Sequence, residues 1–313
     1  MGERKCWLGL SVFQGIGPMR FHLLYEYFGS AKKIWQAQKS ELLVTRLPNN
    51  IANSFLRFRR RFNPEGYSSW LKKKGIKFLT LLDKKYPKNL KQIDDVPFVL
   101  YYKGEIKKED EMAIGVVGTR RPTIYGREVT GNLVADLVVC GLTIVSGMAR
   151  GIDSIAHRTA IENGGRTIAV FACGLDIIYP PENRQLSEMI VQNGALVSEY
   201  PPGTKPSLGS FPYRNRIISG LSLGALVTEG AERSGSLITA RRAGEQGREV
   251  FAVPGPITSR MSAATAKLLK NGAKLVCNVG DVLEELKIEP QIQHLRGGPE
   301  RSRRTGGEIT AEE

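Results

Sequence analysis

The chain has 313 residues, of which 41% are hydrophobic, and its formal net charge is +14. This length suits one large and one small domain, each with its own core. No apolar run is long enough for a signal peptide or a membrane span, and the four cysteines lack metal-ligand spacing. These features exclude a membrane-spanning protein and predict a cytoplasmic protein with reduced thiols.

The positive charge is concentrated in the first third of the chain. Residues 1–110 contain 22 Lys and Arg against 10 Asp and Glu, whereas residues 111–313 contain 23 against 21. A field of this sign attracts a polyanion such as nucleic acid, or an anionic membrane surface. A basic face that only aids solubility stays open as an alternative, because charge alone does not identify a ligand.

Residues 1 to about 65 have the pattern of short helices rich in arginine and aromatic side chains. Among them, Gly15-Ile16-Gly17-Pro18 fits the turn of a helix-hairpin-helix unit, whose glycines expose N–H groups to a phosphate. The same residues also suit an ordinary turn between two helices. A basic connecting stretch follows, and the apolar run at 96–102 fits an additional strand.

From about residue 112, apolar runs of strand length alternate with longer amphipathic segments. The runs are 113–118, 142–147, 166–173, 195–200, 224–230, 249–255 and 273–278. The segments that we expect to be helical are 125–140, 153–163, 236–246 and 263–271. Strands that are apolar almost throughout, alternating with helices, indicate a parallel sheet covered on both faces.

Right-handed crossovers then give an α/β fold with a doubly wound, mostly parallel, Rossmann-like sheet. We expect a small all-α domain at 1–66, of the helix-hairpin-helix or SAM-like type, and the Rossmann-like domain at 67–289. Residues 290–313 are rich in glycine and charge and are expected to be a flexible linker or tail.

Three of the predicted strands lead into loops rich in glycine and arginine. In an open parallel sheet, ligands bind beyond the carboxyl ends of the strands. Glycine lets the backbone approach an anion, helix N-termini offer N–H groups, and arginine makes forked contacts with phosphate oxygens. These loops therefore predict a row of bound phosphates. The candidates are Gly118, Thr119 and Arg120 after the first strand, Ser146, Gly147, Arg150 and Gly151 after the second, and Ser234, Gly235 and Ser236 after the fifth.

The fourth strand is followed by PPGTKPSLGSFPYRNRIISGLS, which we interpret as a long loop beside the crevice. Its candidate contact residues are Lys205, Phe211, Tyr213, Arg214 and Arg216. Aromatic side chains interleaved with arginines suit a strand with unstacked bases and a charged backbone. Alternatively, Phe211 and Pro212 close a hydrophobic corner and Arg214 pairs with an acid.

The sequence provides no set of residues to which a reaction can be assigned. It has no GxxxxGK[ST] motif, and GVVGTRRPTIYG lacks the GxGxxG spacing of a nicotinamide site. The nucleophile candidates have no recognisable histidine partner, and His157 fits a packed structural role better than a catalytic one. We therefore expect no catalytic residue, no cofactor and no bound metal.

Taken together, these loops strongly resemble those of the DNA-processing protein A family, also called DprA or Smf. The resemblance covers residues 75–273 and includes AIGVVGTRRPTIYG, LTIVSGMARGIDSIAHRTAI, TIAVFACGLDIIYPPEN, GALVSEYPPGT, FPYRNRIISGLS and TEGAERSGSLITARRAGEQGREVFAVPG. It implies an extended Rossmann fold that binds single-stranded DNA without sequence preference and forms a homodimer. It also implies that the protein protects incoming strands during natural transformation and helps to load the RecA recombinase.

The resemblance marks the loop residues named above as strand-binding positions and adds Asn215 to Phe211, Arg214 and Arg216 in FPYRNR. Two departures from the family pattern stand out. Leu208-Gly209-Ser210 lies where some members have a basic residue, and Lys205 is the candidate replacement. Many members also end in a winged-helix-like domain, which we do not expect within this sequence.

Two other functions remain open at this point. A Rossmann-like phosphoribohydrolase would hold a nucleoside monophosphate and would need a glutamate one turn into a helix. EGAERSGSLITA has no acid at residues 236–239, where such a group is required. A purely structural interaction module leaves the positive charge unexplained.

Overall fold

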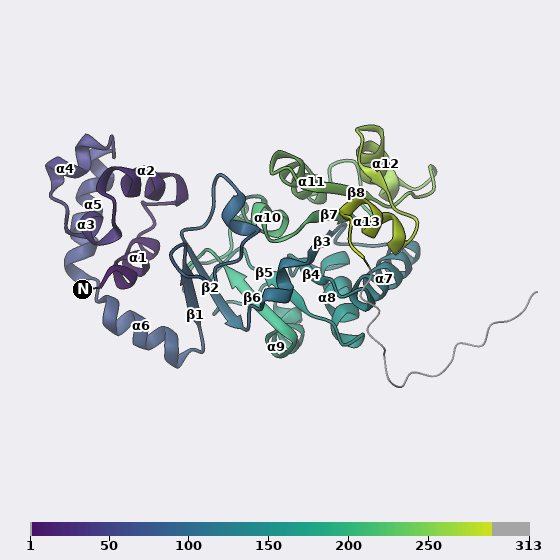
Figure 1. The fold of residues 1–313 in the computed structure, drawn as a ribbon, viewed down its shortest axis with the longest axis horizontal. Helices are drawn as coiled ribbons and strands as arrows, with labels where there is room; N and C mark the ends of the chain where they lie inside the picture. The colour runs from purple at the N-terminus through teal and green to yellow at the C-terminus, as the bar shows by residue number, and fades with distance from the viewer. Residues whose placement is uncertain (1, 290–313) are drawn as a thin grey trace, which may run out of the picture.

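The computed structural model describes residues 2–289 of the chain (Figure 1). Its α-helices are α1 Glu3–Val12, α2 Pro18–Phe28, α3 Ala31–Gln36, α4 Lys39–Val44, α5 Asn49–Arg61, α6 Pro64–Lys73, α7 Ile124–Val139, α8 Ile152–Glu162, α9 Arg184–Asn193, α10 Ser210–Leu221, α11 Ser236–Glu245, α12 Ala263–Lys270 and α13 Val279–Leu286. Its strands are β1 Lys77–Thr80, β2 Val99–Gly104, β3 Ala113–Val117, β4 Thr143–Ser146, β5 Thr167–Val170, β6 Gly194–Ser198, β7 Gly224–Val227, β8 Glu249–Ala252 and β9 Lys274–Leu275. Within this part of the chain, no helix has both the length and the apolar character needed to span a bilayer.

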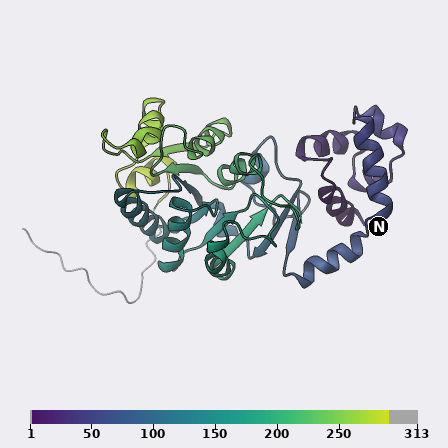
Figure 2. The ribbon, with the colours of Figure 1, turned by 180° about the vertical axis from the view of Figure 1, so that it is seen from behind.

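The helices α1–α6 form a separate lobe at one end of the molecule, as both views show (Figures 1 and 2). Aromatic packing joins this lobe to the segment before β2. The rings of Phe21 and Phe98 stack with 3.9 Å between their centroids, and Trp7 lies 4.6 Å from Phe21. Burial of these large side chains contributes to the attraction between the two parts. The helix α6 crosses the predicted domain boundary at residue 66, because Asn63 caps it and Pro64 begins it.

One nine-stranded sheet carries the rest of the fold, in the order β1-β2-β6-β5-β4-β3-β7-β8-β9. The seven strands β3 to β9 pair in parallel with their neighbours in this order. At the β6 edge, β2 pairs with β6 and β1 pairs with β2, both antiparallel. The chain moves outward from β3 through β4 and β5 to β6, then returns through α10 to β7 on the other side of β3. The doubly wound fold expected from the sequence is confirmed, with its switch point between β3 and β7.

Alternating side chains of the strands bury two apolar layers, one on each face of the sheet. On one face Ile114 and Val116 of β3 pack with α7, α8 and α13. On the other face Val117 packs with α10 and α11, together with the segment around Leu90. This period of two, with helices on both sides, explains why the strands read as continuous apolar runs.

The segment 210–221 differs from the sequence prediction, which treated it as part of a long loop. It is the helix α10, and almost every residue from Arg214 to Leu221 is buried. A helix that is buried all round shows no alternation of polar and apolar faces, so the periodicity that reveals other helices is missing. The proline at 212 lies in the first turn, where it does not interrupt the helix.

Replacement of Gly194 by alanine is expected to destabilise the sheet, because an added Cβ would lie 1.9 Å from the carbonyl oxygen of Thr167. The backbone of β5 must move to relieve this contact, which is expected to lower the free energy of unfolding by about 2 kcal/mol or more. Gly131→Ala in α7 is the control, since no atom lies within 4 Å of its added Cβ. That change should raise stability by about 0.5 kcal/mol. Urea denaturation measures both, and equal effects would contradict the proposed clash.

Candidate nucleic-acid interface

The loops at the carboxyl ends of neighbouring parallel strands are joined by backbone hydrogen bonds. The N–H of Thr119, after β3, donates to the carbonyl of Glu229, after β7, at 2.8 Å. The carbonyl of Thr119 accepts from the N–H of Ile152, after β4, at 3.1 Å. The three loops that the sequence singled out therefore form one continuous edge. We call this edge the rim, and it comprises residues 118–123, 147–151, 171–180, 229–236 and the first turn of α10.

Close packing between the loops explains their glycines. An added Cβ on Gly118 would lie 2.5 Å from Ile152, and one on Gly151 would lie 2.3 Å from the carbonyl oxygen of Thr119. Gly151 also has a φ of +78°, which disfavours any side chain. Glycine is thus required at these positions by the loops themselves.

Two carboxylates of the protein occupy the helix N-termini at the rim. The carboxylate of Glu229 accepts from the N–H of Thr123 at 2.9 Å and from its hydroxyl at 2.5 Å, at the start of α7. Asp153 accepts from the N–H groups of Gly147 and Ala149 at 3.1 and 3.2 Å, at the start of α8. The sequence pattern predicted that N–H groups at these helix starts would bind a ligand phosphate. The structure shows that three N–H groups just before the two helices, those of Thr123, Gly147 and Ala149, are already bonded to these carboxylates.

The guanidinium of Arg214 is buried beneath the loop that follows β4. Its Nη1 donates to the carbonyl of Gly147 at 2.6 Å and also to the carbonyl of Val170. Burial lowers the pKa of Arg214 to about 10, and the nearby Asp153 carboxylate opposes this shift. Burial likewise raises the pKa of Asp153, with Arg214 acting in the opposite direction. Arg214 therefore ties together the ends of β4 and β5 instead of projecting toward solvent.

An exposed arginine and two aromatic rings meet on the solvent side of the rim. The guanidinium of Arg120 lies over the ring of Phe211, 5.6 Å from its centroid. The ring of Tyr179 lies 5.5 Å from Phe211, and 44% of Tyr179 is exposed. We call these three residues the aromatic platform. Cation–π contact holds the arginine beside the rings, which keep free surface.

The remaining rim candidates differ in exposure. Arg150 is exposed and forms an ion pair with Glu182, and Lys205 is exposed on the approach to α10. Ser146 is buried, with its hydroxyl donating to the carbonyl of Val116 at 2.6 Å. The hydroxyls of Ser234 and Ser236 lie 2.8 Å apart at the start of α11, and Gly235 between them is exposed.

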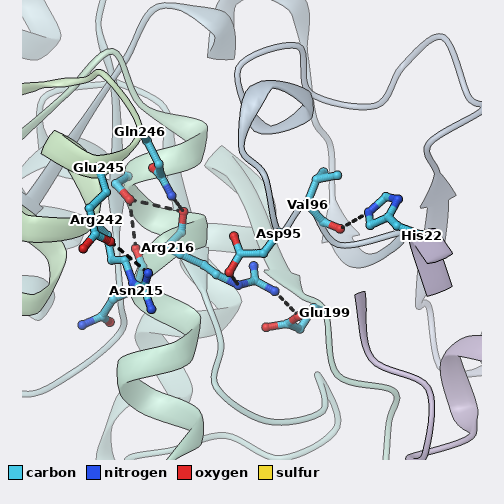
Figure 3. A network of polar contacts seen from close by, with 10 residues as sticks. His22, Asp95, Val96, Glu199, Asn215, Arg216, Arg242, Glu245 and Gln246 are labelled. Carbon is cyan, nitrogen blue, oxygen red and sulfur yellow. Dashed lines mark hydrogen bonds and ion pairs between the residues drawn. The ribbon is translucent and has the colours of Figure 1, made fainter. Parts of the chain in front are cut away.

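Arg216 is completely buried on α10 and pairs with acids instead of facing solvent. Its guanidinium pairs with Glu199 at 2.5 Å and with Asp95 at 3.1 Å, as Figure 3 shows, and stacks on the Tyr213 ring at 4.2 Å. Its neighbour Asn215 accepts from Nε of Arg214 at 3.2 Å. The direct strand contact expected of Arg214 and Arg216 is therefore not offered by their side chains in this structure.

Tyr179 was not among the residues predicted from the sequence, although it lies in the quoted motif IIYPPEN. The available signal was an aromatic residue followed by two prolines, six residues after the predicted strand at 166–173. His157 is packed as expected: it is buried, its Nδ1 donates to the hydroxyl of Thr167 at 2.7 Å, and burial lowers its pKa to about 3. Among the residues that the structure describes, no group of three or more His, Cys, Asp or Glu side chains is arranged to hold a metal.

Comparison with known proteins identifies the family of this chain. The family model described as DNA recombination-mediator protein A matches residues 77–287. The chain belongs to this family. DNA processing protein DprA of Bacillus subtilis is 47% identical over 224 residues, which cover 71% of this chain and 75% of that protein. Protein Smf of Synechocystis is 39% identical over 295 residues, which cover 93% of this chain and 74% of that protein.

Solved structures with the DprA name share the fold. The X-ray structure of DprA from Streptococcus pneumoniae matches with a TM-score of 0.77 at 35% identity, and covers 89% of this chain and 96% of that chain. A structure of DNA processing protein A from Helicobacter pylori matches with a TM-score of 0.60 at 34% identity, covering 67% of this chain and 96% of that one. The Helicobacter pylori structure concerns the single-stranded DNA binding mode of that protein. The family resemblance seen in the sequence is confirmed.

In this member of the DprA family, the Glu199 carboxyl is expected to make stability depend on pH. Burial raises its pKa to about 7 from an ordinary value of 4.5, with Arg216 limiting the rise. The folded state thus holds this proton more tightly than the unfolded chain. Stability therefore falls as the pH rises between these two values. In Glu199→Gln, the loss of unfolding free energy between about pH 5 and about pH 8 should be smaller by about 2 kcal/mol.

Urea denaturation at the two pH values measures the difference between the unsubstituted chain and its variant. Glu245→Gln is the control, because Glu245 is exposed on α11 and is paired with Arg241 and Arg242. An equal pH dependence in Glu199→Gln and in the unsubstituted chain would rule out the raised pKa.

Proposed function

We propose that the chain binds single-stranded DNA at the rim, without sequence preference and without performing chemistry on it. The aromatic platform carries this proposal, since it combines one exposed cation with two partly free rings. Rings accept the face of any base, and a guanidinium accepts phosphate from any nucleotide. The Helicobacter pylori relative, whose structure concerns its binding of single-stranded DNA, supports the same ligand for this chain.

The side chains of the rim divide into contact residues and supporting residues. Arg120, Arg150 and Lys205 are exposed and suited to phosphates, and Phe211 and Tyr179 are suited to bases. We propose that Gly235 and its two serine neighbours add hydrogen-bond donors at the start of α11. The buried residues Arg214, Arg216 and Ser146 and the half-buried Asn215, with Gly118, Gly147 and Gly151, support the strand site by fixing the loops. Thr119 links the loops through its backbone.

We also propose the wider role that the family resemblance implies. The bound strand is protected during natural transformation, and the protein helps to load RecA on it. The chain acts in the cytoplasm as a homodimer. Binding by exposed side chains suits this role, because a strand held through its phosphates and base faces is released to a recombinase without breaking base-specific contacts.

Arg120→Ala is expected to weaken binding of all oligo-dT and mixed single strands to about the same extent. Loss of one phosphate contact should also reduce the log–log salt slope by about 0.7. Fluorescence anisotropy with a labelled strand at several salt concentrations measures both quantities. Arg158→Ala on α8 is the matched control, because Arg158 is exposed and away from the rim loops. An unchanged slope in Arg120→Ala would remove the proposed phosphate contact.

Arg216→Ala is expected to behave differently from Arg120→Ala. It leaves Glu199 and Asp95 without their cation, so the free energy of unfolding should fall by about 3 kcal/mol. The salt slope for single strands should stay unchanged under conditions where the variant is folded. Urea denaturation and anisotropy together test this, and a reduced slope with normal stability would return Arg216 to the contact residues.

Tyr179→Ala and Phe211→Ala are each expected to cost about 1–3 kcal/mol of binding free energy, if a base stacks on each ring. Tyr179→Phe retains the ring and is the control, with affinity expected to match the unsubstituted chain. The same titration with a nucleoside monophosphate tests the phosphoribohydrolase alternative. Tight mononucleotide binding with release of base would replace the proposal.

A further inference from the structure

The rim continues beyond the proposed strand site, onto the loop of residues 253–262 that follows β8. We call this segment the β8 loop. The N–H of Gly230 donates to the carbonyl of Met261 at 2.7 Å, and the carbonyl of Gly230 accepts from the N–H of Ala264 at 2.9 Å. The β8 loop is also closely packed within itself, since an added Cβ on Gly255 would lie 2.4 Å from the hydroxyl of Ser262. The β8 loop is therefore held against the loop after β7 by the same kind of backbone contacts that join the rest of the rim.

The β8 loop is also tied to the beginning of α7. The hydroxyl of Tyr125 donates to the carbonyl of Pro254 at 2.5 Å, which places this ring between the two segments. Tyr125 comes five residues after Arg120 of the aromatic platform. The start of α7 therefore connects the loop that holds Arg120 with the β8 loop.

Large apolar side chains are exposed on this continuation of the rim. Ile257 is fully exposed, Ile124 is 85% exposed and Tyr125 is 38% exposed. Burial of these side chains by a ligand would be favourable, by about 25 cal/mol per Å² of apolar surface. A ligand that covers them would also meet the charges of the neighbouring side chains.

The charged side chains around the apolar group are mostly arginines. Arg121, Arg233 and Arg260 are exposed, and within residues 2–289 none of them forms an ion pair. The exposed acids are Glu232 in the loop after β7 and Glu128 on α7, and Glu128 is next to the exposed Arg127. Exposed arginines beside apolar side chains match a polyanion with apolar faces, which describes unpaired nucleotides.

We propose that the β8 loop is a second contact segment for the same single strand. Bases lie against Ile257 and Tyr125, and phosphates lie at Arg121 and Arg260. This inference rests on the proposed function and extends it from the aromatic platform across β3 and β7 to β8. With neighbouring strands about 4.8 Å apart, the extension adds roughly 10 Å of path, or a few nucleotides.

Length-dependent binding tests the extension. Oligo-dT of about 3 nucleotides is expected to occupy the aromatic platform alone, and oligo-dT of about 10 nucleotides is expected to cover both segments. In the double variant Ile257→Ser with Arg260→Ala, the dissociation constant for the longer strand should rise about tenfold. The constant for the shorter strand should stay unchanged. The salt slope for the longer strand should fall by about 0.7, which corresponds to the lost phosphate contact.

The matched control is Leu82→Ser with Arg158→Ala, since both side chains are exposed outside the rim loops. Equal affinity of the double variant and the unsubstituted chain for both lengths would overturn the extension. The exposed apolar side chains would then be assigned to binding of a protein partner. Equal weakening for both lengths would also overturn it, because the β8 loop would then belong to the same short site. Failure of the proposed function gives a different result: the unsubstituted chain would bind neither strand, or Arg120→Ala would bind both normally.

Discussion

The buried guanidinium of Arg214 is the interaction on which the rim depends. It lies under the loop after β4, almost out of contact with water, and its donors face the carbonyls of Gly147 and Val170. A buried cation costs free energy unless its donors are satisfied and an opposite charge is near, and Asp153 supplies that charge. The same carboxylate holds the N–H groups of the loop. One cation and one anion thus fix the backbone of the loop after β4 from its buried side. Exposed side chains form the solvent side of the rim.

This arrangement separates the chain from proteins that cradle phosphates with free backbone N–H groups. In the loops before α7 and α8, the N–H groups of Thr123, Gly147 and Ala149 are already bonded to Glu229 and Asp153. We therefore expect most of the affinity of the rim to come from arginine, lysine and aromatic side chains. Such contacts are individually adaptable and depend on salt, which suits a flexible polymer more than a single nucleotide held in one pose.

Much of the fold was predictable from the sequence, because the strands of a covered parallel sheet are apolar runs. The expected strands correspond to β3 through β9, and the run at 96–102 overlaps β2. The alignment of three glycine-rich loops on one edge also followed from parallel pairing. The helix α10 could not be predicted in this way, since it is largely buried and has no polar face to reveal its helical period. Arg214 and Arg216 were therefore assigned to the surface: an arginine in the sequence does not show whether its charge meets solvent or a buried carboxylate. Residues 290–313, where a linker is expected, lie outside the described residues.

The helix α10 also constrains how the sequence can vary. Phe211 lies in its first turn, Arg214 reaches the loop after β4, and Arg216 reaches Glu199 and the Asp95 segment beside the helical lobe. Each residue advances an α-helix by about 100° and 1.5 Å. A one-residue insertion between Phe211 and Arg216 would therefore rotate at least one of the three side chains away from its partner. Insertions and deletions should therefore be confined to the segment before Ser210, where the backbone is not yet helical. The spacing of FPYRNR along this helix therefore fixes the positions of the Phe211 ring, the loop after β4 and the Asp95 segment relative to one another.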